Sequence, residues 1–130
     1  MEVMRETFDA WNRGDIDAWL GMWDEEAEFY LPRAQLEGVA SGFHGAEGLR
    51  GLVAELAEVW ESYPRMDLVE TRDAGDQVMG LIRFRGRARA SGVELDLPMG
   101  AVAVIRNKKI LYCRFFSDPY DALKAVGLRE

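Results

Sequence analysis

The sequence predicts an α+β domain in which about three helices cover the concave face of a strongly curved, mostly antiparallel sheet. Two observations support this prediction. Apolar residues recur mainly at helical spacing up to Ser62 and at alternating positions from Met66 onward. The later segments are joined by short turn signals such as Ala74-Gly75-Asp76, which is typical of antiparallel hairpins and not of parallel βαβ units. At 130 residues the chain fits one domain, 1–130.

Three helices are expected in the first half of the chain. The first ends at Gly14, because glycine readily adopts the left-handed conformation that closes a helix. The second follows Asp15, a good N-cap residue, and the third runs from about residue 46 to 62. A short strand at 27–31 and a glycine-rich loop at 33–45 separate these two helices. The apolar faces of the three helices carry Val3, Met4, Phe8 and Trp11; Ile16, Trp19, Leu20 and Trp23; and Leu49, Leu52, Val53, Leu56, Val59 and Trp60.

Longer strands are expected at residues 66–71, 77–90, 93–105 and 109–117. Most of them exceed the usual strand length of about 5 or 6 residues. Because a long sheet packed against helices twists and coils, we expect a cone-shaped sheet. Asp118-Pro119 begins a short terminal helix, since Asp is a good N-cap and Pro is favoured at the first helical position.

Alternation along these strands assigns side chains to the two faces of the sheet. One face carries Arg83, Arg85, Arg87 and Arg89. If that face is concave, Arg83 lies deepest and can bind a ligand anion. The opposite face carries Val78, Ile82, Phe84, Ala101, Ala103 and Ile105. No predicted helix remains to cover this second apolar face, so we expect a homodimer formed sheet to sheet.

Composition excludes several classes of function. The net charge of −7 argues against nucleic-acid binding, which needs a clustered positive surface. No apolar stretch is long enough to span a membrane, and no secretory signal is recognisable. One cysteine, Cys113, and one histidine, His44, make an internal disulfide impossible and a metal cluster unexpected. We therefore expect a cytoplasmic protein without a cofactor, since a phosphate-binding glycine turn is also missing.

The order of motifs resembles the SnoaL-like family of the nuclear transport factor 2-like superfamily. Residues 8–18, FDAWNRGDIDA, are similar to the opening of these proteins. Phe43-His44-Gly45, Gly75-Asp76, Lys109-Ile110 and Asp118 follow in the family's order. The resemblance implies a cystatin-like α+β barrel-roll that encloses a small-molecule pocket. The family includes polyketide cyclases, ketosteroid isomerases and limonene-type epoxide hydrolases, so the resemblance does not decide the reaction.

Two of the family's mechanisms do not fit these residues. Matching positions to the isomerase type places Thr7, Leu31 and Gly100 where that mechanism needs a Tyr and two Asp residues. Matching to the epoxide hydrolase type retains Arg83 but places Arg85 and Phe115 where carboxylates are needed. A cyclase- or dehydratase-like proton transfer stays open, with Asp118 or His44 as the acid or base.

Each polar candidate also has a structural interpretation. His44 could act as a base at neutral pH, or hydrogen-bond the loop ahead of the third helix. Asp118 could be an acid/base group or only the cap of the terminal helix. Arg83 and Arg85 could bind an anionic ligand, or Arg85 and its neighbours could pair with Glu94 and Asp96 on the next strand.

The expected catalytic candidates are His44, Arg83 and Asp118, and the expected ligand-binding residues are Thr7, Trp11, Trp23, Leu31, Val53, Leu81, Arg85, Gly100, Cys113 and Phe115. From these residues we predict a protein that binds a hydrophobic, oxygenated or anionic small molecule in an apolar pocket. Two alternatives stay open. One is an acid/base enzyme of the cyclase, isomerase or dehydratase type, and the other is a structural domain whose pocket is filled by its own side chains.

Overall fold

The computed structural model describes residues 2–32 and 42–127, and every structural statement below concerns these residues. Four helices and six strands follow one another along the chain. They are α1 (Glu2–Asn12), α2 (Ile16–Gly21), β1 (Trp23–Tyr30), β2 (Gly42–His44), α3 (Gly45–Val59), β3 (Arg65–Ala74), β4 (Gln77–Arg87), β5 (Glu94–Arg106), β6 (Lys109–Phe116) and α4 (Pro119–Ala125). The α+β class predicted from the sequence is confirmed.

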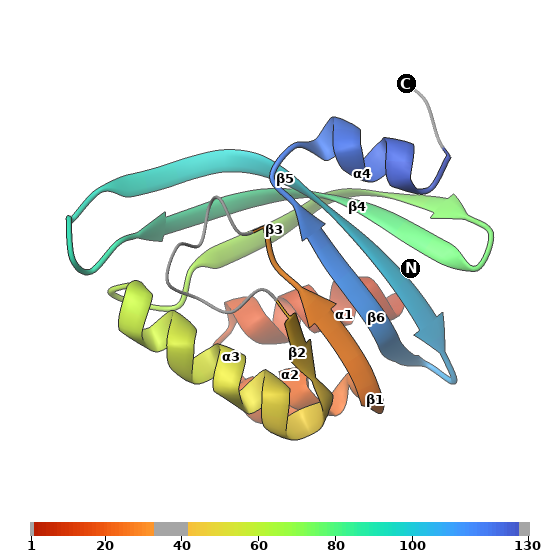
Figure 1. The fold of residues 1–130 in the computed structure, drawn as a ribbon, viewed down its shortest axis with the longest axis horizontal. Helices are drawn as coiled ribbons and strands as arrows, with labels where there is room; N and C mark the ends of the chain where they lie inside the picture. Colours follow the sequence, from red (N-terminus) through yellow and green to blue (C-terminus); the bar gives the residue numbers. More distant parts are fainter. Residues whose placement is uncertain (1, 33–41, 128–130) are drawn as a thin grey trace.

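The strands form one curved sheet in the order β2-β1-β6-β5-β4-β3. All neighbouring pairs are antiparallel except β1 and β6, which run parallel. Figure 1 shows α1, α2 and α3 together on one side of the sheet and α4 alone on the other. The main hydrophobic core lies between the sheet and the first three helices.

Local sequence signals explain where several elements begin and end. Gly14 has a φ of +79°, and the Asp15 side chain accepts a hydrogen bond from the Ala18 N–H at 3.0 Å, which caps α2 as expected. Between β5 and β6, Asn107 and Lys108 both have positive φ, at 52° and 63°. Two successive residues with positive φ form a type I′ turn, whose backbone twist matches the right-handed twist of the two strands it joins.

The structure corrects two element boundaries. Trp23, expected at the end of a helix, is the first residue of β1, and an irregularity in the pairing with β6 separates it from Glu28. Gly42–His44, expected within a loop, pair with the end of β1 as a short edge strand. A run of three residues carries no readable periodicity, so only the tertiary pairing reveals this strand.

On β4 and β5 the expected assignment of sheet faces is wrong by one residue. Val78, Ile82, Phe84, Ala101 and Ala103 belong to the core beneath the helices. Arg83, Arg85 and Arg87 instead point to the outer face, where their side chains are about half exposed. Since side chains alternate with a period of two, an error of one position inverts a whole strand. The sheet-to-sheet homodimer stays a prediction, but the apolar residues that suggested it are covered by this chain's own helices.

The outer face is also partly covered by α4, a helix whose docking the sequence did not indicate. Met79 and Val102 from the sheet form a second buried cluster with Ala122 and Leu123 of α4. Gly100 lies directly under this helix, because a Cβ built on it would be 2.5 Å from the Ala122 Cβ. No helix among the described residues is long and apolar enough to cross a membrane.

Candidate functional site

The candidate site is an apolar cavity in the main core, between the concave face of the sheet and the first three helices. Its volume is about 40 Å³, above the roughly 10–15 Å³ that one water molecule needs. The helices contribute Met4, Thr7, Phe8, Trp11, Trp19, Leu52 and Leu56. The strands and their ends contribute Trp23, Phe29, Leu31, Met66, Phe84, Leu95, Leu97, Met99, Ala103, Ile110, Cys113 and Phe115.

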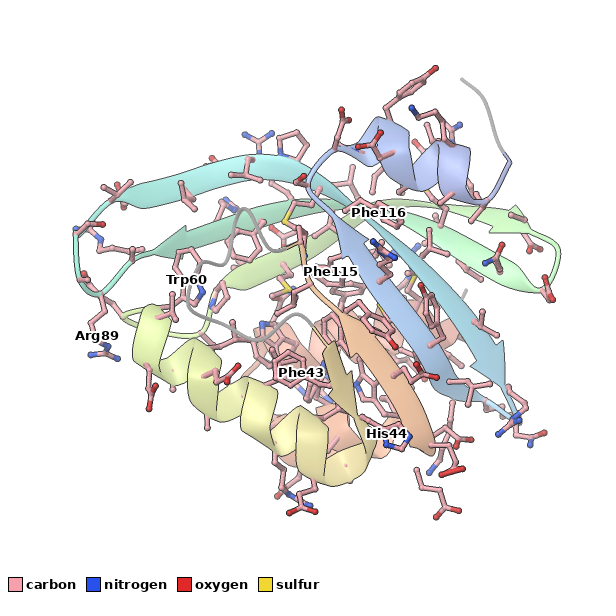
Figure 2. The ribbon with its side chains drawn as sticks, in the orientation of Figure 1. Phe43, His44, Trp60, Arg89, Phe115 and Phe116 are labelled. Carbon is pink, nitrogen blue, oxygen red and sulfur yellow. The ribbon has the colours of Figure 1, made fainter. Side chains whose placement is uncertain are left out.

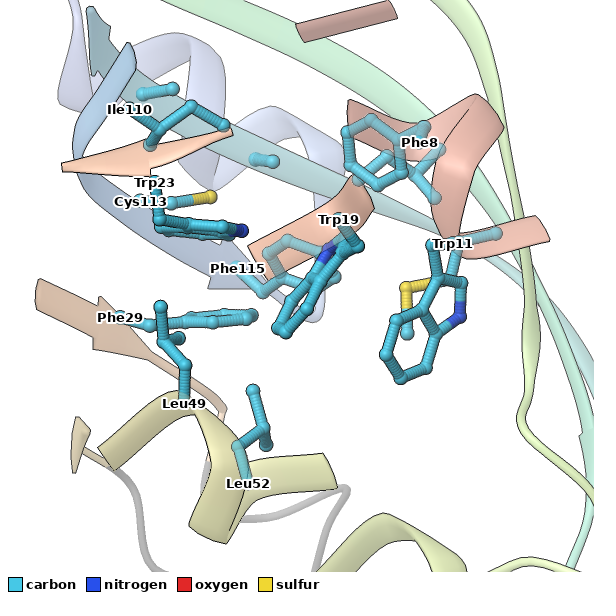
Figure 3. Packing of buried hydrophobic residues seen from close by; sticks show 14 of the residues in the cluster. Phe8, Trp11, Trp19, Trp23, Phe29, Leu49, Leu52, Ile110, Cys113 and Phe115 are labelled. Atoms are coloured by element: carbon cyan, nitrogen blue, oxygen red, sulfur yellow. The ribbon is translucent and has the colours of Figure 1, made fainter. Parts of the chain in front are cut away.

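Aromatic rings form a connected wall around one side of the cavity (Figure 3). Trp11 contacts Trp19 with a centroid distance of 5.1 Å, and Trp19 contacts Trp23 at 5.5 Å. Trp23 stacks on Phe29 at 5.3 Å, and Phe29 contacts Phe115 at 5.2 Å. Each such pair adds about 0.5–1.5 kcal/mol beyond area burial, so this wall is held firmly in place.

Hydrogen bonds fix α1 against the start of β3, at the edge of this wall. The Trp11 indole N–H donates to the Pro64 carbonyl at 2.7 Å. The Asn12 side chain both donates to the Met66 carbonyl, at 2.7 Å, and accepts from the Met66 N–H, at 2.8 Å. Thr7, the hydroxyl residue of the described lining, donates to the Val3 carbonyl at 2.7 Å. The Trp11 N–H and the hydroxyl hydrogen of Thr7 are therefore already donated within the protein.

Cys113 is the titratable residue among the described lining residues. Burial raises the pKa of its thiol from 9.0 to about 12. A thiol held protonated at neutral pH is a poor nucleophile and behaves as a small apolar group. The cavity as described is therefore electrically neutral near pH 7.

Six of the ten residues expected to bind ligand do line the cavity: Thr7, Trp11, Trp23, Leu31, Cys113 and Phe115. Whether they contact a ligand stays a prediction. The other four lie elsewhere. Val53 is buried in the core beside the cavity, and Leu81 packs with the cluster under α4. Gly100 also lies under α4, and Arg85 is on the outer face, paired with Asp67.

Arg83 does not enter the cavity, contrary to the placement expected for a concave strand face. Its guanidinium Nε donates to an Asp96 carboxylate oxygen on the outer face of β5. This hydrogen bond, together with the positive charge, lowers the pKa of Asp96. Arg87 pairs at 2.9 Å with Glu94, the residue directly opposite it on β5. The expected pairing with Glu94 and Asp96 therefore holds for Arg87, while Asp96 pairs with Arg83 and Arg85 pairs with Asp67 of β3 instead.

His44 and Asp118 are exposed and also lie outside the cavity lining. His44 is at the N-cap position of α3, where its side chain makes no capping hydrogen bond, and Figure 2 shows it at the rim of the sheet. Asp118 accepts a hydrogen bond from the Tyr120 N–H at 2.9 Å, as the N-cap of α4. The structure thus gives Asp118 the structural role weighed above and does not bring the three polar candidates together.

Several lining residues were missed, among them Trp19, Phe29, Leu52, Phe84, Leu95, Leu97, Met99 and Ala103. A usable signal was present on β5. Glu94 and Asp96 alternate with Leu95 and Leu97, and charged side chains seldom face a core. That alternation assigns the leucines to the concave face, and pairing with β4 then assigns Phe84 to the same face. Within the described ranges, no group of three or more His, Cys, Asp or Glu residues could hold a metal ion.

Comparisons with known proteins agree with this architecture. A family model described as a SnoaL-like domain matches residues 4–113. An NTF2-like protein of unknown function from Burkholderia pseudomallei K96243 has a TM-score of 0.80 at 17% identity, covering 98% of this chain and 96% of that one. TerC co-crystallised with polyporic acid has a TM-score of 0.79 at 17% identity, covering 96% and 95%.

A third similar structure is a hypothetical protein with a ketosteroid isomerase-like fold from Catenulispora acidiphila DSM 44928, in complex with trimethylamine. Its TM-score is 0.75 at 16% identity, covering 98% of this chain and 94% of that one. At such identities these structures support the fold alone. The comparison with curated proteins found no match.

Proposed function

The chain belongs to the SnoaL-like domain family, and from this premise we propose that it binds a neutral, hydrophobic small molecule in its internal cavity. The lining itself carries the proposal. Every described lining residue is apolar, aromatic or uncharged near pH 7, and the one hydroxyl is paired within α1. Small-molecule sites are concave, mostly apolar and rich in aromatic side chains, as this one is.

The size of the cavity sets a condition on binding. At about 40 Å³ it holds only a few atoms without adjustment, so a larger ligand must displace side chains. Met4, Met66 and Met99 line the cavity and are the side chains best able to move. Methionine is unbranched, has three rotatable side-chain bonds and adapts to irregular shapes. The aromatic wall can then stay in place while the methionines make room.

The acid/base alternative finds no comparable support among the described residues. General acid/base catalysis needs a titratable group within hydrogen-bond reach of the reacting atom, directly or through one water. His44, Arg83 and Asp118 are outside the lining, and the Cys113 thiol is protonated at neutral pH. Binding without proton transfer by these groups is therefore the function that the geometry supports best.

Toluene, which is small, neutral and apolar, is a suitable probe. Since a ligand that binds only the folded state raises the melting temperature, we expect the Tm to rise as toluene is added. The rise should saturate and should be accompanied by a change in tryptophan fluorescence, because Trp11, Trp19 and Trp23 line the cavity. No shift up to the solubility limit of toluene would refute the proposal and support a pocket filled by its own side chains.

A matched pair of variants tests whether toluene binds in the cavity. Ala103→Leu adds three carbons to a fully buried lining residue and should abolish the shift by filling the space. Ala54→Leu adds the same atoms at an exposed position of α3 and should leave the shift unchanged. Equal shifts in both variants would place the toluene site outside the cavity.

A further inference from the structure

One buried hydrogen-bond donor in the cavity wall lacks a partner. Three buried side-chain polar atoms of the described residues have none: Trp23 Nε1, Trp60 Nε1 and Glu55 Oε2. Of these three residues, Trp23 alone lines the cavity, and it is 94% buried. Buried polar groups are nearly always hydrogen-bonded, so an unpaired one in a binding cavity requires an explanation.

The Trp23 ring is held in a fixed orientation. It stacks on Phe29 with an interplanar angle of 13°, and Trp19 contacts it at 63°. Figure 3 shows its indole nitrogen directed inward, toward the side on which Trp19 and Phe115 lie. An aromatic face is at best a weak acceptor, so these neighbours do not satisfy the N–H. The donor is therefore preorganised for an acceptor that arrives from outside.

We infer that the ligand of this cavity carries a carbonyl or ether oxygen on an apolar skeleton, and that this oxygen accepts a hydrogen bond from Trp23 Nε1. The inference rests on the proposed binding function and specifies its ligand class. A carboxylate is disfavoured, because no cationic side chain lies among the described lining residues to compensate a buried charge. A protonated amine is disfavoured in the same way, because no anionic side chain lies among the described lining residues. A hydroxyl would bury a donor of its own, for which the described lining offers, apart from sulfur, a single side-chain acceptor, the oxygen of the Thr7 hydroxyl that already donates to Val3.

Acetophenone and α-methylstyrene test this inference, because they have nearly the same shape and differ in a carbonyl oxygen against a methylene group. Their affinities are measured by calorimetry with the wild type, Trp23→Phe and Trp19→Phe. Trp23→Phe removes the N–H and retains an aromatic ring against Phe29. Because this variant leaves the carbonyl oxygen unpaired, the affinity for acetophenone should fall about tenfold relative to that for α-methylstyrene. Trp19→Phe replaces a different indole of the same wall by a phenyl ring and should leave the ratio of the two affinities unchanged.

Nitrogen-15 NMR of the wild type provides a measurement that does not depend on a folded variant. The indole N–H signal of Trp23, one of four, should move downfield with acetophenone and not with α-methylstyrene. If both probes bind and neither the Trp23 signal nor the affinity ratio distinguishes them, the donor inference is wrong while the binding function stands. If neither probe binds, both are wrong.

Discussion

The buried thiol of Cys113 makes the stability of the protein depend on pH in a defined direction. Its pKa is raised from 9.0 to about 12 by burial, so the folded state keeps the proton that the unfolded chain loses above pH 9. This contribution to stability is complete below pH 9 and is lost as pH rises toward 12. The free energy of unfolding should fall by about 1.4 kcal/mol per pH unit, reaching a loss of about 2–3 kcal/mol at pH 11.

Urea denaturation followed by tryptophan fluorescence measures this loss at pH 8, 9, 10 and 11. The informative quantity is the difference between the wild type and Cys113→Ala, because all other ionisable groups are common to the two proteins. The variant keeps those groups and lacks the thiol, and its stability should therefore fall less steeply above pH 9. Parallel curves for the two proteins would refute the buried, protonated thiol and the dry environment that raises its pKa.

Further substitutions test the surroundings of the cavity. Arg83→Leu should raise the pKa of Asp96 toward 3.8, as measured by a carboxyl NMR titration, and should leave toluene affinity unchanged. Weaker toluene binding would show that Arg83 contributes to the binding site. Gly100→Ala should cost about 1–3 kcal/mol in urea, because the new Cβ would meet α4; no loss would contradict the docking of that helix. Gly51 is exposed on α3, and a Cβ built on it would have no neighbouring atom within 4 Å. Gly51→Ala should therefore stabilise the protein by about 0.5–1 kcal/mol in the same assay, and destabilisation would contradict these open surroundings. Asp118→Ala should cost about 1 kcal/mol through loss of the α4 cap, and an unchanged urea midpoint would contradict that capping role.

The sequence predicted the elements well wherever local physics dominates. The apolar stripe of α3, the Asp15 and Asp118 caps and the turn after β5 each follow from residues close together in the chain. The parallel pairing of β1 with β6 and the edge strand β2 depend on contacts between distant segments, and no local pattern encodes them. Helices and hairpins were therefore predictable, while the sheet order was not.

The site was predicted in part, and the errors on the sheet have one cause. Trp11, Trp23, Cys113 and Phe115 were expected as wall residues because large apolar side chains collect in concave sites. Both faces of β4 carry apolar residues, so alternation alone does not decide which face of this strand lies inside. Arg83 was therefore assigned to the concave face in error. The outer face carries apolar residues such as Met79 and Val102 because α4 covers them, and periodicity along the chain does not predict where that helix packs.

Uptake of a small apolar molecule into the cavity is tested most directly by a crystal soaked in iodobenzene, whose iodine is located by its anomalous scattering. We expect a single strong iodine peak enclosed by Trp11, Trp23 and Phe115, with shifts confined mainly to the neighbouring methionine side chains. An unoccupied core at saturating iodobenzene, or iodine bound only at the protein surface, would contradict a ligand-binding cavity.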